Sequence, residues 1–230
     1  MTDRLRLLWT AQNFYKNLVN LEIMNRKISV LFVTISFLLF LSCDNKPTVN
    51  KAVNSEIKKG VAPVANNEVA VIEMENSAAY GTIKIELYSN IAPKMVARFK
   101  ELAKEGFYNG VTFHRVNQSV IQAGDPLSKD SDPTNDGTGG SDKPNLPAEF
   151  SDIPYDAGIV GAARGQANDT ANSQFFITLK REAGFDNRYT IFGKVIEGMN
   201  NIRTISGVSP KDRERPIENV LIKTVTIQPK

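Results

Sequence analysis

The sequence predicts a mainly β protein, built as a closed eight-stranded antiparallel barrel capped by two α-helices. The first observation behind this prediction is that polar and apolar side chains alternate with a period of two over residues 111–122 and again over residues 172–179. Such alternation is typical of strands that bury one face. The second observation is that further short runs of this kind outnumber the helical patterns. Many short strands joined by turns favour a barrel, because closure leaves no exposed edge.

The first expected elements are two strands, at residues 69–75 and 82–88. In the second of them Ile83, Ile85 and Leu87 share one face, as a half-buried strand requires. The other expected elements are two strands within residues 111–122, strands at 157–163, 173–179, 189–195 and 220–227, and a helix at 198–205.

A first helix is expected directly after the first two strands. Pro93 suits the first turn of a helix, where its missing backbone N–H does no harm. Val96, Phe99 and Leu102 then recur at helical spacing, and Gly106 ends the pattern. These apolar residues are expected to belong to the core and not to a site.

A long stretch at residues 124–149 is crowded with Gly, Pro, Asp, Ser and Asn, and includes the run GTGG at residues 137–140. This composition does not build a regular element. A loop of this length within a domain is usually functional or mobile, so we expect one of the two here.

Composition and charge exclude several classes of protein. The chain has 230 residues, 41% of them hydrophobic, and a formal net charge of +3, which suits a soluble globular protein. Lys and Arg are interspersed with Asp and Glu, so we expect no nucleic acid partner. With one cysteine and one histidine, an internal disulfide, a cysteine cage and most histidine metal sites are excluded. We therefore expect no metal and no cofactor.

Residues 1–42 are expected to be a leader with a lipoprotein signal peptide. A short basic stretch precedes an apolar run at residues 28–41, which is short for a membrane span and typical of a signal peptide core. Ser42 and Cys43 follow at once, and a small residue before a cysteine resembles the cleavage box of bacterial lipoproteins. We expect lipidation at Cys43 and a place in the cell envelope, lipid-anchored to a bacterial membrane on its periplasmic or surface side. An uncleaved anchor and an ordinary signal peptide are the alternatives, and Met24 is an alternative start.

Residues 43–68 are expected to be the lipidated cysteine and a flexible tether. Beyond the cysteine this segment is rich in Asn, Lys, Val and Ala, shows no sustained period and contains no aromatic residue. Such a segment buries too little apolar surface to offset the entropy of ordering. The folded domain is therefore expected over residues 69–230.

Four side chains from the two alternating runs are expected to share one surface. They are Arg115, Gln122, Gln174 and Phe176. A fixed cation, amide donors and an exposed aromatic ring suit recognition of a peptide and polarisation of an amide, and the set contains no obvious nucleophile. The alternative for Arg115 is a surface salt bridge, and the alternative for Phe176 is simple core packing.

Several motifs occur in a fixed order along the chain. They are FHRV at 113–116, IQAGDP at 121–126, GTGG at 137–140, EF at 149–150, SQFFIT at 173–178 and FGKVIEGM at 192–199. Their order and spacing resemble the cyclophilin family of peptidyl-prolyl cis/trans isomerases, over essentially all of residues 69–230. The resemblance implies a cyclophilin-like barrel and an enzyme that accelerates rotation about Xaa-Pro bonds in proline-containing polypeptides. We expect it to act as a monomer.

The resemblance also implies residue roles. Arg115 matches the catalytic arginine, Gln122 the glutamine that binds the substrate backbone and helps hold the arginine, and Phe176 the aromatic floor of the proline pocket. Arg164 is expected to act through its backbone groups, and His114 is not expected to be a base, because isomerisation transfers no proton. The substrate-contacting positions implied are Phe113, His114, Val120, Ala162, Ala163, Arg164, Gln174, Phe185 and Tyr189.

Two departures from the family pattern bear on the pocket. The stretch between Val116 and Gln122 is one residue shorter and lacks the family's aromatic, leaving Ser119. Gly184 precedes Phe185 where the family often has a tryptophan or histidine, and this tryptophan contributes to cyclosporin binding in many members.

Two classes of function follow from the sequence. The first is an active isomerase that assists the folding of exported or envelope proteins. The second is a cyclophilin-fold peptide-binding module or chaperone with low activity, motivated by the lost aromatic. Retention of Arg115, Gln122 and Phe176 favours the first.

Overall fold

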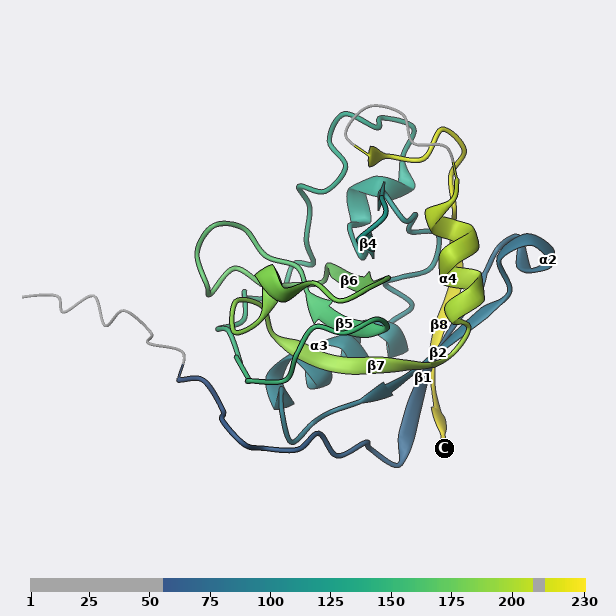
Figure 1. Cartoon of the computed structure of the whole chain (residues 1–230). Helices are drawn as coiled ribbons and strands as arrows, with labels where there is room; N and C mark the ends of the chain where they lie inside the picture. The colour runs from purple at the N-terminus through teal and green to yellow at the C-terminus, as the bar shows by residue number, and fades with distance from the viewer. Residues whose placement is uncertain (1–55, 209–213) are drawn as a thin grey trace, which may run out of the picture. The chain divides into compact units, whose positions relative to one another are not determined.

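The computed structural model of the chain describes residues 56–208 and 214–230 (Figure 1). The expected leader, the alternative start Met24 and the expected lipidation site Cys43 lie outside the described residues. The strands are β1 (Glu68–Met74), β2 (Thr82–Leu87), β3 (Arg115–Val116), β4 (Val120–Ala123), β5 (Ile159–Ala162), β6 (Phe175–Thr178), β7 (Ile191–Glu197) and β8 (Ile222–Pro229). The helices are α2 (Ser77–Tyr80), α3 (Pro93–Lys104) and α4 (Met199–Ser206), with 3-10 helices η1 (Pro126–Lys129) and η2 (Ala183–Phe185).

The strands form one eight-stranded sheet in the order β3-β4-β6-β5-β7-β2-β1-β8. Every pair of adjacent strands in this sheet is antiparallel. Its two edges meet. Just before β3, Thr112 pairs with Leu221, which directly precedes β8. The backbone N–H of Ile222 also donates to the Val111 carbonyl at 2.8 Å. The mainly β, eight-stranded antiparallel barrel that the sequence predicts is thus confirmed.

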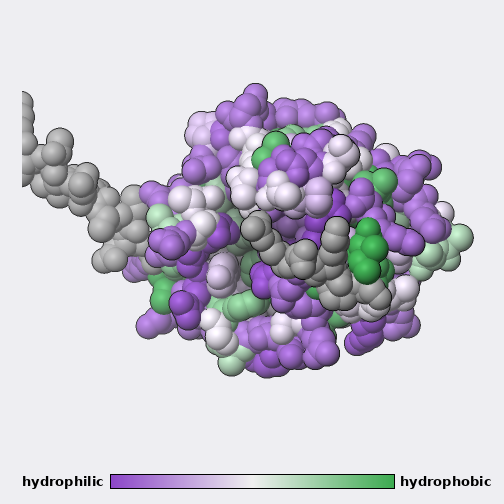
Figure 2. Space-filling model, turned by 90° about the horizontal axis from the view of Figure 1, so that it is seen from above, coloured by the Kyte–Doolittle hydropathy of each residue, from purple (hydrophilic) through white to green (hydrophobic). Residues whose placement is uncertain are grey.

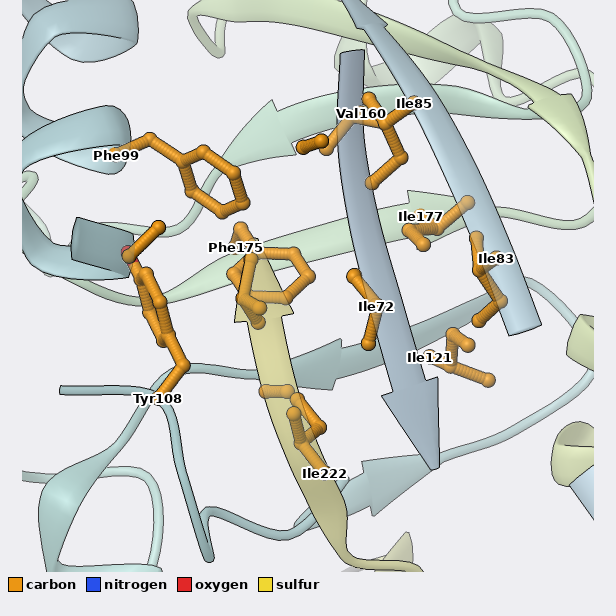
Figure 3. Close-up of a cluster of buried hydrophobic side chains, with 14 of the residues drawn as sticks. Ile72, Ile83, Ile85, Phe99, Tyr108, Ile121, Val160, Phe175, Ile177 and Ile222 are labelled. Carbon is orange, nitrogen blue, oxygen red and sulfur yellow. The ribbon is translucent and has the colours of Figure 1, made fainter. Parts of the chain in front are cut away.

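The inside of the barrel holds the main core (Figure 3). Ile83, Ile85 and Leu87 of β2 are fully buried there, as their shared face predicts. Phe175 of β6 meets Phe99 of α3 edge-on, with the ring centroids 5.5 Å apart. Burying a side chain of this size is worth about 1.5–3 kcal/mol relative to leaving it in water. This core is therefore the main source of stability.

Both longer helices lie where the sequence predicts them and bury apolar residues in the main core. Pro93 occupies the first turn of α3, and Phe99 and Leu102 lie on its buried face. Ile202 and Ile205 do the same for α4, which packs against β2 and β4. The elements α2, η1 and η2 have no predicted counterpart, because one turn is too short for a helical period to emerge.

Residues 58–67, called the strap below, run across the outside of the barrel. The backbone N–H of Lys58 donates to the Phe150 carbonyl at 2.9 Å, and that of Asn66 donates to the Leu87 carbonyl at 2.9 Å. This part of the expected tether is therefore bound to the domain. Composition gives no sign of it, because backbone groups of any sequence can make such hydrogen bonds.

The long loop between β4 and β5 is organised by the buried Asp125. Its carboxylate accepts hydrogen bonds from the backbone N–H groups of Leu127 at 2.8 Å, of Gly139 at 3.2 Å and of Gly137. Gly137 has a φ of 84°, in the left-handed region that favours glycine. One carboxylate thus fixes the shape of the GTGG run.

Seen from above, the described surface is largely hydrophilic, with small and separate hydrophobic spots (Figure 2). Among the described residues, no helix is both long enough and apolar enough to cross a membrane. In the same residues no group of His, Cys, Asp and Glu side chains is arranged to hold a metal ion.

Candidate active site

A row of residues across four neighbouring strands carries the candidate site. The pairing register sets Arg115 of β3 opposite Gln122 of β4, and Gln122 opposite Phe176 of β6. Phe176 in turn lies opposite Gly161 of β5. Residues paired across strands project from the same face of a sheet. The register therefore brings together the cation, the amide and the aromatic ring that the sequence analysis places on one surface.

A pocket of about 100 Å³ opens on this row. Charged, amide and aromatic groups meet in it, and every residue of its lining is among the site residues that the sequence predicts. The lining consists of Arg115, Val120, Gln122, Ala163, Arg164, Phe176, Phe185 and Tyr189.

Beside the pocket lies an outer aromatic cluster, made of Tyr155, Phe176, Phe185 and Tyr189, of which the last three line the pocket. Phe176 stacks on Tyr155 with centroids 5.8 Å apart and meets Phe185 and Tyr189 edge-on, each at 5.5 Å. Behind the ring Gly161 makes room, since a Cβ there would lie 2.4 Å from Cζ of Phe176. Packing thus holds the ring as a fixed floor. Tyr155 is a member that sequence analysis misses.

A second hollow of about 340 Å³ shares Gln122, Ala163 and Arg164 with the pocket. Gln174 lines this second hollow. Nε2 of Gln122 donates to Oε1 of Gln174 at 2.9 Å, and Nε2 of Gln174 donates to the Gly139 carbonyl at 2.8 Å. These amides connect Gln122 of β4, through Gln174 directly before β6, to the long loop.

Arg164 uses its side chain to hold two loops together. Its guanidinium lies over the Tyr189 ring, 4.8 Å from the centroid, where a cation is attracted to the ring face. Its Nη2 donates to the Arg188 carbonyl at 2.9 Å, and its Nη1 donates to the Gly165 carbonyl at 2.9 Å. These contacts occupy the side chain with structural bonds, which leaves the backbone groups as the part expected to face a substrate.

Arg115 is held by Glu214, a residue that the sequence analysis misses. Nε of Arg115 donates to Oε2 of Glu214 at 2.5 Å, and the two side chains are 45% and 42% exposed. Burial by itself raises the pKa of Glu214, but hydrogen bonds from Arg115 and Asn117 and the charge of Arg115 outweigh it and hold this pKa below its usual value. Gln122, which the resemblance expects to hold the arginine, donates to Gln174. No sequence signal links Arg115 to a partner 99 residues away.

Two residues expected at the pocket lie inside the barrel. Phe113 is fully buried in the main core, because the regular strand begins only at Arg115 and the alternation does not extend back to it. Ala162 pairs with the inward-facing Phe175 and is also buried in that core. Its neighbour Ala163 is the small residue of the pocket. Both expected placements are therefore corrected.

His114 also lies away from the pocket, 4% exposed, close to Gly137 of the long loop. Burial lowers its pKa, and the negative charges of Asp125 and Asp136 offset this in part. The lowered pKa favours the neutral imidazole in this buried place beside the long loop.

The fold and the site together define a β-barrel protein with a small pocket, lined by charged, amide and aromatic side chains, on its outer wall. The family model described as cyclophilin type peptidyl-prolyl cis-trans isomerase/CLD matches residues 71–227. The chain belongs to this family.

Curated relatives are named for the activity that gives this family its name. The chain is 45% identical to a probable peptidyl-prolyl cis-trans isomerase of Brucella suis over 130 residues, which cover 54% of this chain and 66% of that protein. It is 40% identical to the peptidyl-prolyl cis-trans isomerase ppi1 of Schizosaccharomyces pombe over 167 residues, covering 69% of this chain and 100% of that protein.

A solved structure has the same fold. The cyclophilin type peptidyl-prolyl cis-trans isomerase of Cryptosporidium parvum matches with a TM-score of 0.63 and 28% identity, covering 71% of this chain and 98% of that one. The same Cryptosporidium protein has also been crystallised in the presence of the dipeptide Ala-Pro.

Proposed function

We propose that the protein is a peptidyl-prolyl cis/trans isomerase whose pocket holds the proline ring of an Xaa-Pro bond. The observation that carries the proposal is the placement of Arg115, Gln122 and the Phe176 ring around one pocket. An arginine keeps its charge, an amide binds a peptide backbone and an aromatic wall accepts an apolar ring. Family membership and the activity named for the relatives support the same function.

The proposed chemistry breaks no bond. Rotation about a peptide bond faces a barrier of about 18–20 kcal/mol, because nitrogen shares its lone pair with the carbonyl. When the bond twists, the lone pair localises on the prolyl nitrogen and becomes an acceptor for the Arg115 guanidinium. A contact that forms only in the twisted state lowers the barrier without tightening either planar state.

The other lining residues hold the substrate in this proposal. The NH₂ group of Gln122 is bound to Gln174, so Gln122 offers its carbonyl oxygen to a substrate N–H. Phe176 forms the floor beneath the proline ring. Val120 and Ala163 complete the apolar lining beside it.

A second candidate, a peptide-binding module or chaperone with low activity, is favoured by one observation. The turn between β3 and β4 carries Ser119 in place of the family's aromatic, and on that side the pocket is lined by Val120. A shallower pocket holds the proline ring less firmly, which weakens the alignment of the bond with Arg115.

The test is the exchange rate of an Ala-Pro peptide measured by NMR, with the full-length chain in a mild detergent and an Arg115→Ala variant. We expect the wild type to accelerate exchange and the variant to lose roughly 100-fold, the typical effect of removing one electrostatic donor. A wild type that does not accelerate exchange would refute the proposed isomerase activity, and equal acceleration by the two proteins would refute the role of Arg115. Peptide binding without acceleration would establish the second candidate.

We further propose that Cys43 is lipidated and that the substrates are exported or envelope polypeptides. The apolar run at residues 28–41 and the small Ser42 before the cysteine support this. Radiolabelled palmitate should enter the wild type in cells and not a Cys43→Ser variant. An unlabelled wild type would show that the anchor proposal is wrong.

We also propose that the protein acts as a monomer, since one chain supplies the cation, the amide and the aromatic ring that the proposed chemistry needs, and a second copy is not required. Light scattering on the purified full-length protein, corrected for bound detergent, should give the mass of one chain. A dimer mass that persists on dilution would contradict this.

A further inference from the structure

Asn117 forms the turn of the β3–β4 hairpin, which carries Arg115. The side-chain carbonyl of Asn117 accepts hydrogen bonds from the backbone N–H groups of Ser119 and Val120, both at 2.8 Å. Its own backbone N–H donates to the Val120 carbonyl at 3.0 Å. An asparagine that bonds the backbone just ahead of it fixes a tight turn. This is the stretch that is shorter here than in the family pattern.

One carboxylate holds both the turn and the arginine. Nδ2 of Asn117 donates to Oε1 of Glu214 at 2.8 Å, while Nε of Arg115 donates to Oε2 of the same residue at 2.5 Å. Each carboxylate oxygen therefore receives one donor. Because both donors come from the same hairpin, Glu214 fixes the direction of the Arg115 side chain relative to the strand that carries it.

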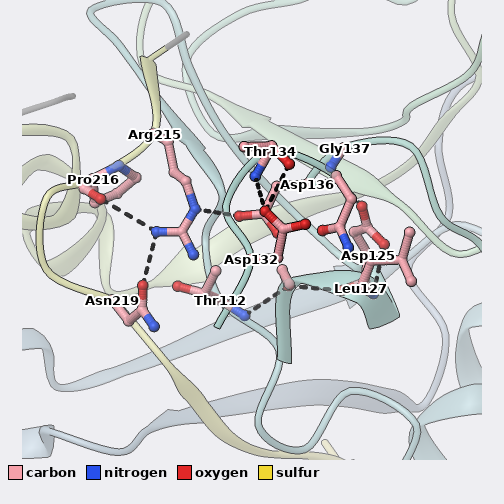
Figure 4. A network of polar contacts seen from close by, with 12 residues as sticks. Thr112, Asp125, Leu127, Asp132, Thr134, Asp136, Gly137, Arg215, Pro216 and Asn219 are labelled. Atoms are coloured by element: carbon pink, nitrogen blue, oxygen red, sulfur yellow. Dashed lines mark hydrogen bonds and ion pairs between the residues drawn. The ribbon is translucent and has the colours of Figure 1, made fainter. Parts of the chain in front are cut away.

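The backbone around Glu214 is itself anchored. Glu214 has a φ of 64°, in the left-handed region that residues other than glycine rarely adopt. The next residue, Arg215, pairs with the carboxylate of Asp136, with side chains 12% and 5% exposed, and its Nη1 donates to Asn219 at 2.8 Å (Figure 4). A strained residue persists only where its surroundings hold it. The position of the Glu214 carboxylate is therefore built into the fold.

We propose that Glu214, seated by Asn117, is the positioning residue of Arg115, an inference that rests on the catalytic role proposed for Arg115. An arginine that is nearly half exposed has many rotamers, and only some of them aim its donors into the pocket. Because Glu214 binds Nε, the Nη1 and Nη2 groups are the donors that Arg115 can offer to the prolyl nitrogen in the pocket. A donor that is already in place needs no reorganisation when the bond twists.

The proposal separates activity from stability. An exposed ion pair contributes little to folding, so the loss of Glu214 should leave the melting curve almost unchanged. The negative charge could instead weaken Arg115 as an electrostatic donor, and in that case its removal would raise the rate. The direction of the change in rate therefore distinguishes positioning from simple screening of charge.

The test compares the full-length wild type with Glu214→Ala, Glu214→Gln and Glu218→Ala by NMR exchange on an Ala-Pro peptide. We expect Glu214→Ala to lower kcat roughly tenfold with KM nearly unchanged, as for a misaligned catalytic group. Glu214→Gln should recover part of the loss, because its amide oxygen still accepts from Nε of Arg115. Glu218 is exposed and lies on the same segment, so Glu218→Ala removes the same charge and should match the wild type.

A double variant tests whether Glu214 acts through Arg115. Arg115→Ala combined with Glu214→Ala should be no slower than Arg115→Ala alone. A further loss in the double variant, or an unchanged or raised kcat in Glu214→Ala, overturns the inference. If Glu214→Ala fails to fold, Glu214→Gln in both backgrounds gives the same comparison. A wild type that does not accelerate exchange at all refutes the proposed function itself.

Discussion

Two neighbouring phenylalanines of β6 end in opposite surroundings. Phe175 packs inside the barrel, edge-on to Phe99 and Tyr108 at centroid distances of 5.5 and 5.8 Å. Phe176 packs outside the barrel in the outer aromatic cluster, stacked on Tyr155 at 5.8 Å. Their exposed fractions are 0% and 4%, so burial does not distinguish the residue of the core from the residue of the site.

The clusters around Phe175 and Phe176 differ in what surrounds them. Side chains from α3 and from several strands surround Phe175 within the main core. The cluster around Phe176 ends at the pocket of about 100 Å³. A cluster closed on every side stabilises the fold, whereas one left open on a side keeps an apolar surface for a ligand. Because side chains along a strand alternate with a period of two, neighbouring residues of β6 can serve different roles, one in the stability of the fold and the other in the pocket.

The largest effect is expected from breaking the inner cluster. Phe175→Ala should lower the free energy of unfolding by about 3–5 kcal/mol, because the surrounding core cannot collapse into the space left behind. Urea unfolding followed by fluorescence measures this loss. The fraction that stays folded should keep its exchange activity, and a loss of activity per folded molecule would contradict the division of tasks.

Breaking the outer cluster is expected to cost less stability and more activity. Phe176→Ala should lower the free energy of unfolding by about 2 kcal/mol, because the ring borders the pocket and its removal merely enlarges that opening. The kcat/KM for an Ala-Pro peptide should fall at least roughly tenfold through loss of the pocket floor. Phe175→Ala is the matched control in both measurements. The comparison fails if the two variants lose stability and activity in equal proportion.

The burial of His114 beside the long loop can be tested through the pH dependence of folding stability. Burial lowers its folded-state pKa below the ordinary value of 6.5, partly offset by Asp125 and Asp136 and reinforced by the positive charges of Arg215 and Arg115. Below pH 6.5 the unfolded chain binds a proton that the folded chain resists, so stability should fall as the pH drops from about 7.5 to 5.

The measurement for this prediction is urea unfolding at each pH. His114→Phe should flatten the profile over that range, because the chain has a single histidine. A wild-type profile that is already flat would contradict the burial of a neutral imidazole.

The smallest effect is expected at the strap, beneath the outer cluster. Nζ of Lys58 donates to the backbone carbonyls of Asn90 at 3.1 Å and Ile91 at 2.7 Å, and Ile91 belongs to the same apolar group as Phe176. Lys58→Ala should cost about 0.5–1.5 kcal/mol, the usual contribution of such bonds. Thermal melts compare it with Lys59→Ala, which removes the same charge at an exposed position. Equal melting temperatures for the two variants would show that the Lys58 bonds do not contribute.

Most of the barrel was predictable, because its signal is the alternation of side chains within each strand. The same alternation placed Arg115, Gln122 and Phe176 on one face, and the register of β3, β4 and β6 does bring them together. It also required one of two adjacent phenylalanines to face the core, and Phe175 does. The alternation within a strand determines which face each side chain occupies, so these features can be predicted without reference to the rest of the chain.

The features that escaped prediction depend on distant partners or on backbone bonds. Glu214 binds Arg115 although the two residues are 99 positions apart, and neither residue type indicates the other as its partner. Phe113 was expected at the pocket from the family resemblance, but it precedes β3 and its side chain packs in the main core. The strap is held largely through backbone groups, so its polar composition resembles that of a free linker.

The strap has a mechanical consequence. If the chain is anchored through Cys43, as proposed, a pull between the anchor and a bound substrate meets Lys58 as the first backbone-paired residue of the part that the structure describes, and its partners are residues 150–152. Those bonds, then the bond of Asn66 to Leu87, lie ahead of β1, which is held between β2 and β8. Tension would peel the strap before it reached the sheet. The strap would thus detach first under load, and the hydrogen bonds of the barrel would stay intact.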